Sequence, residues 1–83
     1  MGQMALYYFD TDNSMERLRD DTGTELADDQ AARDEAMIAI AEMSKDWIPK
    51  DGPQKNITMW VRNSTGETIL VLTLNFALLP VKP

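Results

Sequence analysis

An uncharged and largely apolar run from Ile69 to Leu79 places the strongest constraint on how this chain can fold. It predicts a β-strand, because one face of the run is made of leucine and phenylalanine at every second position: Leu70, Leu72, Leu74 and Phe76. A strand with one face in water alternates apolar and polar residues, but here Ile69 and Val71 make the second face apolar too. That face turns polar only at Thr73 and Asn75. The start of the strand therefore needs cover on both faces.

The size of the chain limits how much cover it can supply itself. With 83 residues it is expected to form a single domain, residues 1–83. A domain of this size buries only about 60–65% of the surface that its unfolded chain exposes. A second copy of the chain is an obvious source of the missing cover, and we expect a homodimer.

The composition argues against several classes of function. A net charge of -6 repels phosphate backbones, so no nucleic-acid partner is expected. The chain has neither cysteine nor histidine, and it therefore lacks the thiolate and imidazole groups that most often bind metals or act as general bases. We expect a protein that is not an enzyme, with no catalytic residue, no cofactor and no metal.

Two features of the sequence bear on its location. The N-terminal segment lacks the basic and long apolar regions of a secretory signal. The C-terminal apolar run is about half as long as the roughly twenty residues that a membrane helix needs. We expect a cytoplasmic protein with no membrane partner.

The first part of the chain predicts two short strands separated by turns. Ala5 to Phe9 is rich in aromatic residues and predicts the first strand, followed by a turn over Asp10 to Ser14. Glu16 to Arg19 predicts a short second strand with Leu18 pointing inward. A second turn is expected over Asp20 to Gly23, where glycine can take a positive φ. The next residues, Glu25 and Leu26, either extend a strand or lead into a helix.

A helix is predicted from Asp29 to Trp47, with Asp28 or Asp29 as its N-cap. Ile38 is the one large apolar residue on its polar face. Pro49 and Gly52-Pro53 are expected to end the helix and form a loop. The buried stripe follows helical spacing and is alanine-rich at its N-terminal half: Ala32, Ala36, Ala39, Ile40, Met43 and Trp47.

A hairpin follows, with strands over Ile57 to Arg62 and Glu67 to Phe76 and a turn over Asn63 to Gly66. A turn of even length would place Met59 beside Leu70, Ile57 beside Leu72, Trp60 beside Ile69 and Arg62 opposite Glu67. We expect the helix to cover the Met59 face. The predicted architecture is α+β, in the order β-β-α-β-β, with one helix on one face of a small antiparallel sheet.

This arrangement leaves Trp60, Ile69 and Val71 on the face opposite the helix. Apolar patches that no intrachain element covers commonly mark interfaces. These three residues are therefore the predicted interface of a small, non-enzymatic interaction module that associates with itself through its sheet.

Acidic residues crowd the first half of the chain, which offers a second hypothesis. The region carries Asp10, Asp12, Glu16, Asp20, Asp21, Glu25, Asp28, Asp29, Asp34 and Glu35. Such a surface could bind a basic protein partner, although turn-forming, capping and solubilising roles also account for it. The spacing from Asp10 to Glu16 is similar to that of a calcium loop, but Met15 and Asp21 occupy the places of its glycine and its final glutamate. A solvated turn is the better interpretation.

The chain resembles a small bacterial family of unknown function. The resemblance rests on Tyr7-Tyr-Phe-Asp10, on Arg19-Asp-Asp-Thr-Gly-Thr-Glu-Leu26 and on Asp29-Gln-Ala-Ala-Arg-Asp-Glu-Ala36, and it covers nearly the whole chain. It implies a fold and a cytoplasmic bacterial setting but no catalytic residue. A weaker likeness is to HicB-type antitoxins, which implies a regulator that binds a basic protein. The chain lacks the Pro-Gly-Cys-like segment of those proteins and an appended DNA-binding motif.

Overall fold

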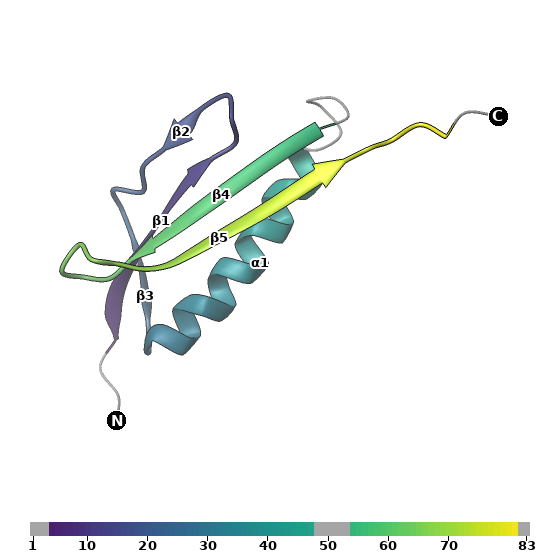
Figure 1. The fold of residues 1–83 in the computed structure, drawn as a ribbon. Helices are drawn as coiled ribbons and strands as arrows, with labels where there is room; N and C mark the ends of the chain where they lie inside the picture. The colour runs from purple at the N-terminus through teal and green to yellow at the C-terminus, as the bar shows by residue number, and fades with distance from the viewer. Residues whose placement is uncertain (1–3, 48–53, 82–83) are drawn as a thin grey trace.

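The computed structural model describes residues 4–47 and 54–81 and contains one helix packed on one face of an antiparallel sheet (Figure 1). The predicted α+β class is confirmed, with one more short strand before the helix than expected. The predicted loop at Pro49 and Gly52-Pro53 lies outside the described residues. The elements are β1 (Ala5–Asp12), β2 (Arg17–Leu18), β3 (Thr24–Leu26), α1 (Asp29–Trp47), β4 (Gln54–Arg62) and β5 (Thr68–Ala77).

The long strands form the sheet in the order β1-β4-β5, with β2 beside β1. The short strands pair with different parts of β1: β3 with Ala5 to Tyr7, and β2 with Thr11 and Asp12. Between these two pairings β1 has no strand partner other than β4. In the described part of the chain, β5 pairs only with β4 and forms the other border of the sheet.

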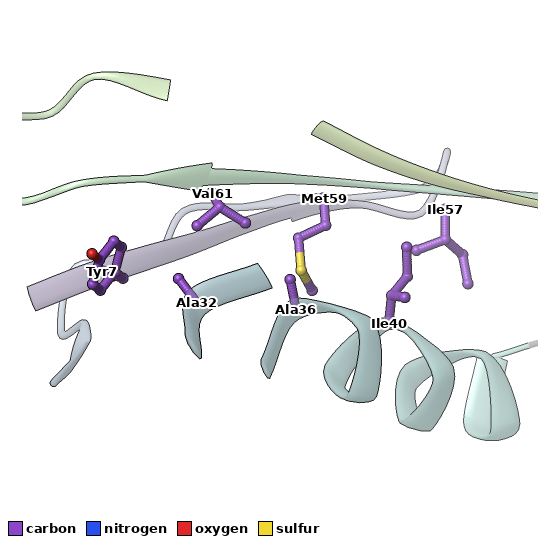
Figure 2. Packing of buried hydrophobic residues seen from close by; sticks show 7 residues of the cluster. All are labelled: Tyr7, Ala32, Ala36, Ile40, Ile57, Met59 and Val61. Atoms are coloured by element: carbon purple, nitrogen blue, oxygen red, sulfur yellow. The ribbon is translucent and has the colours of Figure 1, made fainter. Parts of the chain in front are cut away.

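The hydrophobic core lies between α1 and the inner face of β1, β4 and β5 (Figure 2). The predicted helix bounds are confirmed, and Asp28 is the N-cap, because its Oδ1 accepts a hydrogen bond from the Ala31 N–H at 2.9 Å. The alanine stripe lets the helix approach β4 closely, and Ile38 is exposed as expected. The buried core residues are Tyr7, Ala32, Ala36, Ile40, Ile57, Met59 and Val61.

The prediction for the first hairpin was wrong in three respects: the end of the first strand, the position of the turn and the inward direction of Leu18. β1 continues to Asp12 instead of ending at Phe9. The turn lies at Asn13 to Glu16, where the Asn13 side chain accepts hydrogen bonds from the Met15 and Glu16 amides. Leu18 is exposed, because β2 borders the sheet on the β1 side while α1 packs mainly over β4 and β5.

The predicted register of the second hairpin was also wrong, by two residues. Met59 pairs with Leu72, Ile57 with Leu74, Trp60 with Val71 and Arg62 with Thr68. The turn at Asn63 to Gly66 is where it was predicted, but Gly66 has a φ of 88° and the Asn63 N–H bonds to the Glu67 carbonyl, so only three residues form the loop. This loop is one residue shorter than predicted and shifts the register by one residue. A bulge beside Val61 and Arg62 shifts it by one more. Because two such shifts restore the alternation, Met59 still faces the helix.

Gly23 has a φ of 79°, which confirms the predicted positive φ at this position. A Cβ atom there would lie 2.9 Å from Tyr8 Cε1 and 3.2 Å from the Tyr7 carbonyl oxygen, so the position needs glycine for space as well as conformation. The turn before β3 can therefore pack directly against β1. In the residues that the structure describes, no helix is long and apolar enough to cross a membrane.

Candidate functional site

A polar network occupies the sheet face opposite α1, here called the open face. Asp10 of β1 is only 6% exposed and receives two hydrogen bonds from Arg62 of β4. The Nε–Oδ2 distance is 2.7 Å and the Nη2–Oδ1 distance is 3.1 Å, which is the paired geometry that a guanidinium and a carboxylate favour. The pair joins the two neighbouring strands across the open face.

Asp20, in the segment between β2 and β3, completes this network. Its backbone N–H donates to Asp10 Oδ1 at 2.9 Å, and its carbonyl accepts a hydrogen bond from Arg62 Nη2 at 3.0 Å. Its carboxylate accepts from the backbone amides of Phe9 at 3.1 Å, Thr22 at 3.0 Å and Gly23 at 2.9 Å. The carboxylate thus provides an acceptor for the Phe9 amide, which lies in the part of β1 between the residues that pair with β2 and those that pair with β3.

The network changes the acidity of both carboxyl groups. Hydrogen bonds from Arg62 lower the pKa of Asp10 below its usual value, against the opposing effect of burial. Burial alone would raise the pKa of Asp20, but the hydrogen bonds from the Gly23, Phe9 and Thr22 amides lower it. Both groups are therefore held in the charged form, which suits a structural role. A general acid would need a raised pKa.

Tyr7 forms a separate link between the sheet and the helix. Its hydroxyl donates to Asp29 Oδ1 at 2.6 Å. This hydrogen bond, together with burial and the nearby negative charge, raises the pKa of Tyr7 to about 12. The contact ties the first turn of α1 to β1.

These shifts predict a stability maximum between two pH limits. A carboxyl group with a lowered folded pKa stabilises the fold above its unfolded pKa, near 3.8 for Asp10 and Asp20, and the stability is lost as pH falls through the folded value. The neutral Tyr7 hydroxyl stabilises the fold below pH 10.0, and that stability is lost as pH rises toward 12. Urea midpoints measured across pH should fall at both limits. Asp10→Asn should weaken the fall of the urea midpoint at acid pH, and Tyr7→Phe should weaken its fall at alkaline pH. An unchanged pH dependence in these variants would contradict the assignment.

Two arginines cover aromatic rings on the open face. The Arg62 guanidinium lies 4.8 Å from the centre of the Tyr8 ring, and the Arg17 guanidinium lies 4.5 Å from that of Trp60. Trp60 is half-buried. Arg17 of β2 therefore supplies part of the cover for Trp60 that the sequence requires on this face.

An open depression of about 340 Å³ lies beside the network. Arg62 in its wall already has Asp10 and the Asp20 carbonyl as partners, and Arg19 pairs with Asp21 at 3.3 Å. The depression therefore presents charges that are already paired within the chain. It is lined by Tyr8, Arg19, Asp20, Asp21, Arg62, Ser64, Thr65 and Gly66.

The structure brings together two of the three predicted interface residues. Trp60 and Val71 are direct cross-strand partners on the open face, and Val71 is 53% exposed. Ile69 does not join them. It is the extra residue of the bulge, between Thr68 and Leu70, packs against the core and lines a small depression with Asp29 and Arg33 of α1. The expected three-residue patch is thus reduced to Val71 and the partly covered Trp60.

The border of the sheet formed by β5 was not recognised as a site from the sequence. From Thr68 to Ala77 this strand has no charged residue and no proline. Natural sheets usually shorten, charge or cover such borders, because unpaired backbone groups there can pair with another chain. The β1 side is protected in this way by β2, β3 and the Asp20 carboxylate. The side of β5 that faces away from β4, here called the β5 edge, carries none of these protections within the described residues.

Several acids of the first half have intramolecular roles in the structure. Besides Asp10 and Asp20, Asp28 caps the helix, Asp29 accepts from Tyr7, and Asp12 accepts from the Ser14 amide at 2.8 Å. Within residues 4–47 and 54–81, no group of acidic side chains is placed to hold a metal ion. The hypothesis of a basic partner stays a prediction, with fewer free carboxylates to support it.

The fold and this network define a small α+β domain built around a buried carboxylate–arginine pair. Residues 6–75 match the family described as domain of unknown function DUF6894, and the chain belongs to that family. The match confirms the resemblance to a small family of unknown function. Nothing in the comparisons supports the likeness to HicB-type antitoxins. No curated protein and no solved structure is significantly similar to the chain.

Proposed function

We infer that this domain is a small, non-enzymatic interaction module that associates with a second copy of itself through its sheet. The observation that carries this proposal is the β5 edge, a ten-residue strand with no charge on it and only one neighbouring strand among the described residues. An edge of that kind offers a row of backbone donors and acceptors to an added strand. Identical chains can satisfy the row for each other.

The apolar residues beyond β5 favour the same proposal. Leu78 is 63% exposed and Leu79 is 74% exposed, and they belong to the segment after β5, which runs on beyond the end of the pairing with β4 (Figure 1). Exposed apolar segments of this kind commonly mark interaction sites. Association would remove them from water.

The alternative function is an antitoxin-like regulator that binds a basic partner through the acidic half. It rests on the acidic residues that crowd the first half of the chain and on the weak likeness to HicB-type antitoxins, and the structure assigns intramolecular contacts to several of these acids. It predicts partner binding that weakens strongly with salt, whereas strand pairing through an uncharged edge is expected to depend little on salt.

Sedimentation equilibrium tests self-association. Between about 1 µM and about 1 mM protein, a range that spans moderate dissociation constants, the average mass should rise from 9.4 kDa toward twice that value. Thr73→Lys places a charge at the middle of the exposed β5 edge and should weaken association at least about tenfold.

Thr24→Lys is the matched control, because it makes the same exposed substitution in β3, away from β5. It should leave association unchanged. A strict monomer at every concentration would remove the proposal, and equal weakening by both variants would show that added charge acts without reference to β5.

A further inference from the structure

We propose that two copies pair through their β5 edges, antiparallel and centred on Thr73, to form one continuous sheet with both helices on the same face. This inference rests on the proposed function, because it specifies the surface and register of that self-association. It differs from the interface that the sequence predicts, which uses the open face at Trp60, Ile69 and Val71. The argument depends on the symmetry of the strand, its sequence and the exposed residues around it.

Symmetry restricts the pairing. Two identical edge strands can run antiparallel only about a two-fold axis perpendicular to the sheet. That axis keeps each face on its own side, so helix-side residues pair only with helix-side residues. Leucine-rich positions of one copy therefore meet leucine-rich positions of the other, and the open-face residues Val71, Thr73 and Asn75 meet open-face residues of the other copy.

The bulge and the end of the strand locate the centre. Regular pairing of β5 with β4 begins at Leu70, because the bulge lies beside it, and ends at Ala77. Centring the contact on Thr73 uses the regular stretch from Leu70 to Phe76 fully. It pairs Leu70 with Phe76, Leu72 with Leu74 and Thr73 with its own copy. The helix-side residues Leu70, Leu72, Leu74 and Phe76 are all only half-buried in the single chain, so each gains cover.

The helix supplies a second apolar contribution beside this edge. Arg33 lines a depression together with Ile69 and Leu70, so that flank of α1 lies toward β5. Met37 is one turn further along the same flank and is 51% exposed. With both helices on one face, the two Met37 side chains lie on flanks that point toward each other above the paired strands.

The exposed tail selects a second copy over an unrelated peptide. In this pairing the residues after Ala77 run along the beginning of β5 in the other copy, where its bulge lies. A partner strand that is identical brings its own Leu78 and Leu79 to the symmetrical place, so both exposed tails gain contacts at once. No charge on either β5 opposes the pairing, although each chain carries a net charge of -6.

Single-cysteine variants test the surface and the register, because the chain has no cysteine of its own. Paired residues across an antiparallel contact have Cα atoms about 4.5–5.5 Å apart, within the range that a disulfide spans. Under mild oxidation Thr73→Cys should form a disulfide dimer at least about tenfold faster than Thr24→Cys at the same concentration. A mixture of Val71→Cys and Asn75→Cys should cross-link, whereas each variant alone should do so slowly.

The outcomes separate this inference from the function on which it rests. Association in sedimentation, with Thr73→Cys no faster than Thr24→Cys, would overturn the β5 contact and leave self-association standing. Cross-linking of Val71→Cys alone, or of Asn75→Cys alone, at the rate of their mixture would overturn the register. A strict monomer by sedimentation would overturn both proposals.

Discussion

Replacing Asp20 by alanine is expected to lower the free energy of unfolding by about 3–5 kcal/mol, because the partly buried Phe9 and Gly23 amides and the exposed Thr22 amide lose their acceptor at once. The Asp20 carboxylate accepts from Phe9, Thr22 and Gly23, and the segment that holds it also contacts Asp10 and Arg62. A small domain has a total stability of about 5–15 kcal/mol. The variant should therefore be marginally folded.

Asp21→Ala is the matched control for this prediction. Asp21 is the adjacent aspartate, and its ion pair with Arg19 is exposed on both sides, so its removal should cost less than about 1 kcal/mol. Urea denaturation followed by tryptophan fluorescence measures both variants. Equal stability of Asp20→Ala and Asp21→Ala would show that the carboxylate does not support β1.

Met59→Ala is expected to cost about 2–5 kcal/mol, because it leaves a cavity at the centre of the core. Met59 is fully buried in the middle of β4, between α1 and the sheet (Figure 2). Met15→Ala removes the same atoms from an exposed position in the turn after β1 and should change stability by no more than about 0.5 kcal/mol. Similar losses in both variants would contradict the placement of Met59 at the core centre.

The helix could be predicted from sequence because its signals are local. Asp28 at the cap and the alanine stripe at helical spacing are sufficient to define α1 from Asp29 to Trp47. The direction of the Met59 side chain toward the helix was also predictable, since strand alternation depends only on adjacent residues. Each of these features depends on residues within a few positions of one another.

The hairpin register could not be predicted in the same way. It depends on two single-residue irregularities, the three-residue loop that ends at Gly66 and the bulge beside Val61 and Arg62. Neither has a distinctive residue pattern apart from the glycine. The bulge displaced Ile69 from the open face, and the predicted interface patch was altered for this reason.

The Asp10–Arg62 pair was missed because its partners lie 52 positions apart in the chain. The sequence does carry a local signal for part of the network, since Asp20 followed by Gly23 is a typical side-chain-capped turn. The contact of that turn with the Phe9 amide depends on how β1 packs against the loop, which a single sequence does not reveal. An aspartate that continues the alternation of an aromatic strand, as Asp10 does after Tyr8, is the signal that could have indicated burial.

Hydrogen exchange of the β5 backbone amides, measured at low and high protein concentration, tests the proposed β5 contact most directly. Amides of Leu70 to Phe76 that point away from β4 should exchange freely in dilute protein and become protected as concentration rises. The amides of β2 and β3 should not change. Association in the same samples with no gain of protection along β5 would contradict the proposal that two copies pair through this edge.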